Sequence, residues 1–210
     1  MSKNIAILGA NGCAGSKILS EAKERGYSVK AIVRNRDYIG KNVLYKSVLE
    51  LTKDDLSGVD VVISALGFWQ DDDRHLHTKA LIHLADLLSG TQTRLMVVGG
   101  AGSLYVDDSM SVKLLDTPDF PNEYKPTANA MSQALDALRK RDDVRWTFLS
   151  PAAEFEPDLA RTGEYILANE IFTLNDKGES VIGYADYAVA MIDEIENENF
   201  IQKRFSVVGK

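Results

Sequence analysis

The sequence predicts a doubly wound α/β domain, in which a mostly parallel β-sheet is covered by helices on both faces. Three observations support this prediction. Short apolar runs alternate with segments of helical periodicity, several of the runs are apolar at consecutive positions, and the first and fifth runs end in glycines. Consecutive apolar positions are typical of strands buried on both faces of a parallel sheet. We expect residues 1–210 to form one domain, because this length suits a single core.

The first half of the chain begins with a strand, a glycine turn and a helix. Residues 5–8 are apolar, and a helical stripe of Ile18, Leu19 and Ala22 then stops at Gly26. Further strands are expected at residues 29–33, 43–45 and 59–63, and apolar residues at helical spacing over 76–88 predict the next helix.

The second half continues the same alternation. Strands are expected at residues 95–98 and 146–149, with a helix over 130–138 between them, which gives six βα-type units in all. Beyond Pro151 the pattern weakens to short β-like pieces over 154–180, followed by a helix over 187–195 and a strand over 205–208. We expect residues 151–183 to be a small substrate-side segment that folds over the carboxyl ends of the strands, where such sheets bind ligands.

The charge and composition argue against several classes of partner. The formal net charge is −7, and no cluster of Lys and Arg is long enough to follow a nucleic-acid backbone. No segment has the apolar length of a signal peptide or a membrane span, so we expect a cytoplasmic protein without a membrane partner. Cys13 is the single cysteine, which agrees with a reducing compartment.

The strongest motif is the turn Gly9-Ala10-Asn11-Gly12-Cys13-Ala14-Gly15, between the first strand and the first helix. Its glycines let backbone N–H groups and the helix N-terminus approach a pyrophosphate, which predicts dinucleotide binding by Gly9, Asn11, Gly12, Cys13, Ala14 and Gly15. A purely structural tight turn is the alternative. A catalytic thiol at Cys13 is disfavoured, because no base is evident beside it.

The end of the second strand indicates which nicotinamide cofactor binds. A carboxylate there would bond a ribose 2′-hydroxyl, whereas this chain has Arg34-Asn35-Arg36. Two guanidinium groups can pair with a 2′-phosphate, so NADP(H) is favoured over NAD(H). The alternative is a solvated basic loop, with Asp37 partly offsetting the charge.

These motifs resemble those of the atypical short-chain dehydrogenase/reductases that are named NADH-flavin reductases, in the wider group with biliverdin reductase B and NmrA-like proteins. The resemblance runs nearly end to end. Besides the glycine turn, the residues that carry it are Ala31-Ile32-Val33-Arg34-Asn35, Val61-Val62-Ile63-Ser64-Ala65, Val97-Val98-Gly99-Gly100-Ala101-Gly102-Ser103, Asp116-Thr117-Pro118-Asp119-Phe120-Pro121, Trp146-Thr147-Phe148-Leu149-Ser150-Pro151-Ala152-Ala153, Arg161-Thr162-Gly163 and Asp186-Tyr187-Ala188-Val189-Ala190.

The resemblance implies a Rossmann-type fold and indicates where the dinucleotide cofactor would lie in it. Arg34 would meet the adenosine phosphate, and the remaining implied cofactor contacts are Ser47, Val48, Ala65, Leu66, Gly67, Val98, Gly99, Gly100, Ser150, Pro151, Ala152 and Ala153. Of these, residues 65–67 would follow the ribose and residues 150–153 would lie near the nicotinamide. Ser47 departs from the family, which commonly has an acidic residue near the adenine. The family name specifies NADH, whereas the charges of this chain favour NADPH.

The usual catalytic pair of short-chain dehydrogenases is absent from the sequence. In a Tyr-x-x-x-Lys pair the lysine lowers the tyrosine pKa for proton exchange with a substrate oxygen. Here Tyr124 is followed at that spacing by Ala128, and Pro126 places Tyr124 at or before a helix start. Ser103 and Tyr124 remain candidate catalytic donors to a substrate carbonyl, although loop hydroxyls more often bond their own backbone.

Aromatic and histidine residues after the fourth strand are further candidates. Phe68 and Trp69 stand where an aromatic face could stack on a flavin, and ordinary packing on the next helix is equally expected. His75, His77 and His83 lack the spacing of a metal site, so no metal is expected.

The sequence therefore favours an NAD(P)H-dependent oxidoreductase that reduces a flavin such as FMN or FAD, a quinone or another aromatic small molecule by hydride transfer. Hydride transfer to a flavin does not need the missing pair. The alternatives are an NmrA-like redox sensor that binds the nucleotide without turnover and, less favoured, a nucleotide-sugar epimerase. A monomer and a homodimer are both compatible with the sequence.

Overall fold

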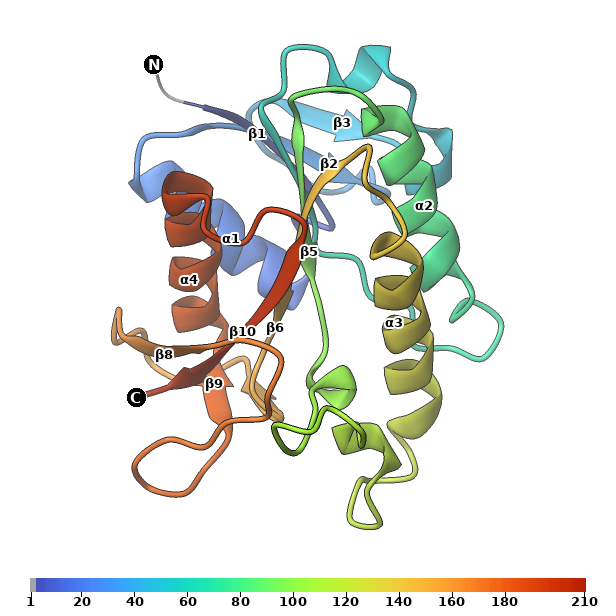
Figure 1. Cartoon of the computed structure of the whole chain (residues 1–210). Coiled ribbons are helices and arrows are strands. Elements are labelled where there is room, and N and C mark those ends of the chain that lie inside the picture. The colour runs from blue at the N-terminus through green and yellow to red at the C-terminus, as the bar shows by residue number, and fades with distance from the viewer. Residues whose placement is uncertain (1–2) are drawn as a thin grey trace.

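The computed structural model describes residues 3–210, which form a mostly parallel sheet between two helical layers (Figure 1). Its eight strands follow the order β3-β2-β1-β4-β5-β6-β10-β8. The strands of this sheet are β1 (Asn4–Leu8), β2 (Ser28–Val33), β3 (Val43–Tyr45), β4 (Val61–Ser64), β5 (Arg94–Val98), β6 (Arg145–Ser150), β8 (Tyr165–Ala168) and β10 (Lys203–Gly209). The predicted doubly wound fold is confirmed. Every strand predicted from an apolar run is present.

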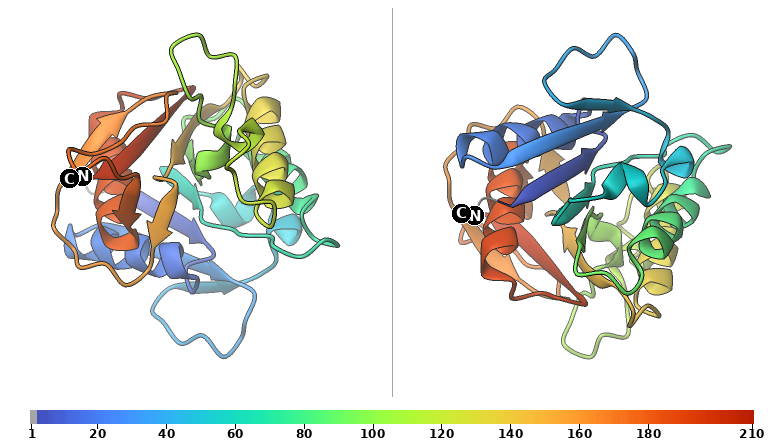
Figure 2. Two further views of the ribbon diagram at one scale, coloured as in Figure 1. Left: turned by 90° about the horizontal axis from the view of Figure 1, so that it is seen from below. Right: turned by 90° about the horizontal axis from the view of Figure 1, so that it is seen from above.

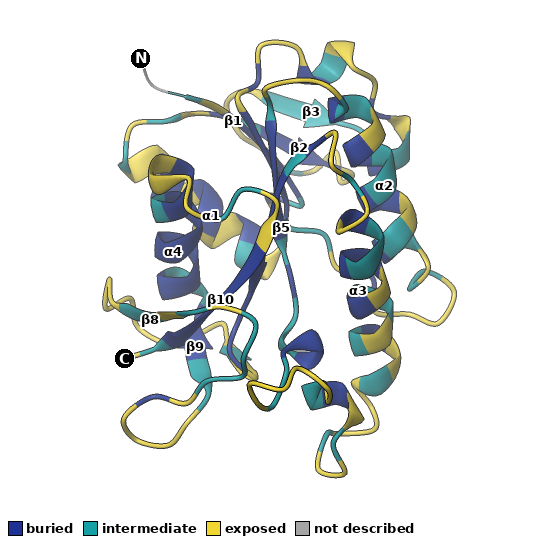
Figure 3. Ribbon diagram, in the orientation of Figure 1, coloured by how far each residue is buried: buried dark blue, intermediate teal, exposed yellow. Residues whose placement is uncertain are grey.

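Two helices cover each face of the sheet. The helices α1 (Cys13–Glu24) and α4 (Tyr184–Asn197) pack together on one face, and α2 (Leu76–Leu88) and α3 (Lys125–Leu138) pack together on the other (Figures 1 and 2). Alternate residues of β1 enter the two cores: Ile5 and Ile7 join the α1 and α4 side, whereas Ala6 and Leu8 join the α2 and α3 side. The buried strands and the exposed outer helix faces are visible in Figure 3.

The expected six βα units are wrong in one respect, because not every crossover contains an α-helix. A loop that projects from the molecule joins β2 to β3 (Figure 2), and the short 3-10 helices η1 (Val48–Glu50) and η2 (Asp54–Leu56) lie between β3 and β4. Glycine, asparagine and charged residues dominate the β2–β3 loop, so it has no apolar stripe to bury.

The residues after Pro151 do not mainly cover the carboxyl ends of the strands, contrary to expectation, because three elements among them belong to the sheet and its helical layer. β10 pairs parallel with β6 and antiparallel with β8, and α4 completes a helical layer. Only a smaller portion lies beyond the carboxyl ends of the strands, where β7 (Glu154–Glu156) pairs with β9 (Val181–Gly183) and residues 170–172 bond to Tyr105.

Candidate functional site

A cleft of about 200 Å³ opens at the carboxyl ends of β1, β2, β3 and β4. The chain winds from β1 towards β3 in one direction and from β4 towards β6 in the other, so β1 and β4 form the switch point of the sheet. Open α/β sheets bind ligands at this point. The lining residues are Leu8, Gly9, Asn11, Gly12, Ile32, Val33, Arg34, Lys46, Ser47, Val48, Leu49, Ala65, Leu66, Gly67, Phe68 and Leu76.

The three glycines of the turn have different structural roles. Gly9 has a φ of +73°, and a Cβ there would lie 2.5 Å from the Ala65 carbonyl oxygen. A Cβ on Gly15 would lie 2.1 Å from the Gly9 carbonyl oxygen, so Gly15 lets α1 pack on the turn. A Cβ on Gly12 would meet only that oxygen, at 3.2 Å, and Gly12 lines the cleft. Gly12 therefore keeps the cleft itself open.

The N-terminus of α1 begins beside this open space. Gly12 is its N-cap, and no side chain caps the helix in the described structure. The first N–H groups of a helix have no partner within the helix, and the helix dipole favours an anion there. The turn and the first residues of α1, including Cys13 and Ala14, thus fit a pyrophosphate.

Arg34 supplies an uncommitted positive charge to the cleft. Every other arginine except Arg36 forms an ion pair with a carboxylate, whereas none is found for Arg34 or Arg36 among residues 3–210. Arg36 is exposed and lies outside the lining. The Asn35 side chain accepts the Asp37 N–H at 2.9 Å and so shapes the loop.

The wall after β3 contains a charged residue that sequence reasoning missed. Lys46 lines the cleft, and its Nζ donates to Asp55 at 2.8 Å, which lowers the pKa of that carboxyl to about 2 together with N–H donation from Thr52. The position of Lys46 directly after a short strand could have identified it. Beside it, Ser47 caps η1 in a reciprocal pair with Glu50, and Val48 adds an apolar surface.

The ends of β5 and β6 lie outside the lining of this cleft. Ser103 and Ser150 are buried there, and the Arg204 guanidinium donates to their hydroxyl oxygens at 3.2 and 3.5 Å. Arg204 also pairs with Glu170. The Ser103 hydroxyl is therefore engaged in a buried network rather than open to a substrate, because Arg204 reaches it from β10.

The other residues expected near a nicotinamide surround this network. Gly99 packs tightly, since a Cβ there would lie 2.1 Å from the Phe148 ring, and a Cβ on Gly100 would lie 3.1 Å from the Met131 sulfur. Pro151 and Ala152 are buried, whereas Ala153 is exposed; Val98 is half-buried. The structure brings none of them into the lining of the cleft.

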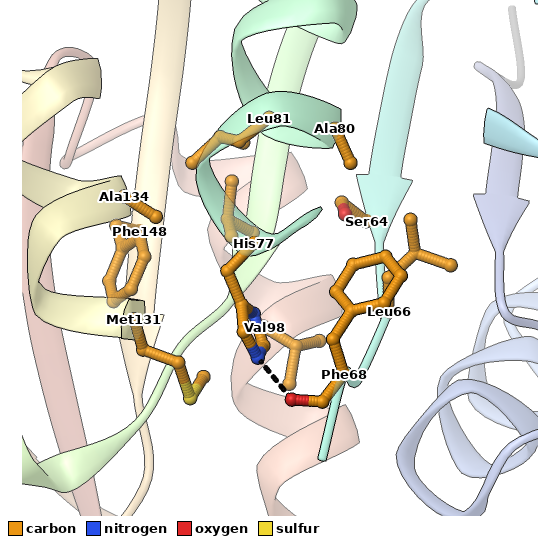
Figure 4. Close-up of a pocket in the computed structure, with 11 residues that line it drawn as sticks. Ser64, Leu66, Phe68, His77, Ala80, Leu81, Val98, Met131, Ala134 and Phe148 are labelled. Carbon is orange, nitrogen blue, oxygen red and sulfur yellow. Dashed lines mark hydrogen bonds between the residues drawn. The ribbon is translucent and has the colours of Figure 1, made fainter. Parts of the chain in front are cut away.

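The aromatic candidates separate into buried and exposed side chains. Phe68 is 6% exposed and packs edge-on against His77 of α2 (Figure 4), so its ring is not open for stacking on a flavin. Trp69 is 61% exposed and Tyr124 is 55% exposed. Tyr124 is the N-cap of α3, which confirms its predicted place at the helix start, and Pro126 lies in the first turn.

Among residues 3–210 no group of three or more His, Cys, Asp or Glu side chains is placed to hold a metal ion. None of the helices in this part of the chain combines the length and apolar character needed to cross a bilayer.

The strand order, the glycine turn and the cleft at the switch point define a Rossmann-type dinucleotide-binding protein. The chain belongs to the NAD(P)H-binding family, whose model matches residues 9–198.

The chain is also similar to three known proteins over nearly its whole length. The uncharacterized protein YwnB of Bacillus subtilis (strain 168) is 46% identical, with 98% of each chain covered. A crystal structure from Streptococcus pneumoniae TIGR4, named a "putative NADH-flavin reductase", is 50% identical with a TM-score of 0.96, and 100% of each chain is covered. A Bacteroides thetaiotaomicron structure named a "putative epimerase" is 32% identical with a TM-score of 0.85, covering 100% of this chain and 98% of that one.

Proposed function

We propose that this protein is an NADPH-dependent oxidoreductase that reduces a flavin or a similar flat aromatic acceptor by hydride transfer. The observation that carries the proposal is the start of α3. Tyr124 stands there as the N-cap, and Ala128 occupies the position where a lysine would complete a Tyr-x-x-x-Lys pair. Alcohol oxidation and sugar epimerisation need a C–O–H proton to move with the hydride, whereas a flavin accepts the hydride directly.

The cleft residues supply position and charge rather than chemistry. Bound NADPH would supply the hydride. The turn around Gly12 and the start of α1 would hold the pyrophosphate, and Arg34 would pair with the 2′-phosphate. The lack of a carboxylate partner for Arg34 in the described structure supports the choice of NADPH, because its charge is free for an anion.

The acceptor would be held by exposed aromatic surface. Trp69 follows the cleft wall directly and is exposed, so its ring is available for offset stacking on a flat ring system. The name of the 50% identical protein from Streptococcus pneumoniae TIGR4, "putative NADH-flavin reductase", supports an acceptor of this kind.

Steady-state oxidation of NADPH with FMN, FAD or a quinone tests the proposal. We expect saturable turnover with at least one of these acceptors, and no turnover for Gly12→Val. Binding of NADPH without turnover would instead support a nucleotide sensor, and conversion of a nucleotide sugar without net NADPH oxidation would support an epimerase. Either result contradicts the proposal.

A further inference from the structure

The wall of the cleft after β4 has little regular structure to hold it. Residues 65–68 all line the cleft, and residues 65–69 belong to no helix or strand. The Ala65 N–H donates to the Leu8 carbonyl at 3.0 Å, which fixes the start of the segment to β1. Beyond its far end, the Gln70 N–H donates to Asp73 and the Gln70 carbonyl accepts from the N–H groups of Asp73 and Arg74. Phe68, between these two points, needs an attachment of its own to hold its place in the cleft wall.

His77 provides this attachment from the first turns of α2. Its Nε2 lies 3.0 Å from the Phe68 carbonyl oxygen, and the two rings meet edge-on with centroids 5.2 Å apart (Figure 4). Among residues 3–210, no other side-chain hydrogen bond reaches residues 65–69. A carbonyl oxygen only accepts, so Nε2 carries the hydrogen and donates it.

The surroundings of His77 keep the imidazole in this neutral, donating form. The ring lies beside a cavity of about 20 Å³ that is lined by apolar side chains, among them Leu66, Met131 and Phe148 (Figure 4). Burial lowers the pKa of His77 below its usual value, although the Phe68 carbonyl and Asp73 act in the opposite direction. The His77 imidazole is therefore neutral at neutral pH, and the Phe68 carbonyl selects the tautomer with the hydrogen on Nε2.

A second histidine on the same helix bonds a segment next to the cleft. The Nε2 of His83 lies 3.1 Å from the Leu51 carbonyl oxygen, just after the η1 helix that carries Val48. Val48 lines the cleft, whereas Leu51 does not. Helix α2 is thus bonded to the wall at Phe68 and to the residue that follows η1, although it contributes only Leu76 to the lining.

We propose that His77 is a positioning residue for dinucleotide binding, which fixes the wall formed by residues 65–68 through its hydrogen bond to the Phe68 carbonyl. This inference rests on the proposed function, because it takes the cleft to be the dinucleotide site. His77 itself does not line the cleft, so it acts on a bound nucleotide only by holding this wall in place. Its loss weakens nucleotide binding rather than hydride transfer itself.

Three variants of the full chain separate this role from general packing. His77→Leu removes the donor, His77→Gln keeps an amide N–H of similar reach, and His75→Leu makes the same change at an exposed position on the same segment. NADPH affinity is measured by calorimetric titration, kcat and KM by steady-state kinetics, and melting temperature by circular dichroism.

We expect His77→Leu to weaken NADPH binding about fivefold, which is the size of effect that the net contribution of one hydrogen bond can produce. His77→Gln should restore the affinity to within about twofold, kcat should stay near the wild-type value, and His75→Leu should match wild type throughout. If His77→Leu does not fold, His77→Met, which also lacks the donor, takes its place.

Wild-type affinity without the donor, or a His77→Gln variant as weak as His77→Leu, would overturn the inference while leaving the proposed function intact. A wild-type protein that binds neither NADPH nor NADH would refute both.

Discussion

Arg34 is the residue that sets the expected cofactor preference. Its guanidinium lies at the cleft without a carboxylate partner in the described structure, whereas arginines such as Arg94 and Arg204 are committed to ion pairs. We predict that wild type binds NADPH about tenfold or more tightly than NADH, because hydrogen bonds to charged groups are worth about 1.5–3 kcal/mol. Arg34→Glu should reverse this order by repelling the 2′-phosphate. Titration of each nucleotide measures both affinities.

Lys140→Glu is the matched control for Arg34→Glu. It changes the net charge by the same amount at an exposed residue just after α3, outside the lining of the cleft. The control should keep the wild-type preference. Equal wild-type affinities for the two nucleotides, or an Arg34→Glu variant that still prefers NADPH, would contradict the assignment.

Tyr124 is expected to orient an acceptor rather than to donate a proton. Ala128 stands where a lysine would lower its pKa, and the phenol is exposed at the helix start. Tyr124→Phe should therefore lose at most about tenfold in kcat/KM with FMN, whereas loss of a true general acid costs about a hundredfold or more. Measurements at several pH values decide between these outcomes. A collapse beyond a hundredfold would favour a carbonyl or sugar substrate.

At the scale of residues, sequence reasoning identified cleft positions better than side-chain environments. Arg34, whose place was inferred from the end of the second strand, and residues 65–67, which the family resemblance implied, all line the cleft. The engagement of Ser103 by Arg204 depends on β10, because the two residues lie 101 positions apart in the chain, and this neighbour could not be read from local sequence. The packing of Phe68 on the next helix was one of the two alternatives that the sequence left open.

In the unit formed by β1, the glycine turn and α1, one glycine is expected to serve nucleotide binding and another to serve packing. Gly12→Val should abolish NADPH binding while circular dichroism stays native, because its side chain would enter the open cleft. Gly15→Ala should instead lower the melting temperature, since its Cβ would collide with the Gly9 carbonyl oxygen. Normal binding by Gly12→Val would place the pyrophosphate elsewhere, and an unchanged melting temperature for Gly15→Ala would contradict the packing role.

The long elements and the three-residue strand β3 could be predicted from the sequence, whereas β7 and β9 could not be placed. The apolar run that forms β5 and the apolar stripe of α2 carry their periodicity over enough residues to distinguish strand from helix. β9 has three residues, and its pairing with β7 is fixed by the fold around it. The β2–β3 crossover differs, because the reason that it lacks an α-helix is local: its residues offer no apolar face to bury.

A buried ion pair joins the layer formed by α1 and α4 to the sheet, and it is expected to affect the stability of the whole molecule. Arg94 on β5 bonds Glu194 on α4 and also donates to Thr147 on β6 at 2.6 Å. Glu194→Gln should destabilise the protein by about 3–5 kcal/mol in urea unfolding, because Arg94 would remain buried without a counter-charge. The double variant Arg94→Met and Glu194→Gln should be more stable than Glu194→Gln alone. A double variant of lower stability would show that the pair acts through its neutral hydrogen bonds.

The place of β10 in the sheet also constrains the order in which the strands can pair as the chain folds. Residues 203–209 lie between β6 and β8, so β8 has no partner strand in this sheet until they are present. Strands β1 to β6 can pair as the ribosome releases them, since each neighbours a strand synthesised earlier. β8 cannot join the sheet until a segment made about forty residues later is present, so this edge of the sheet is completed only when the C-terminal strand has been synthesised.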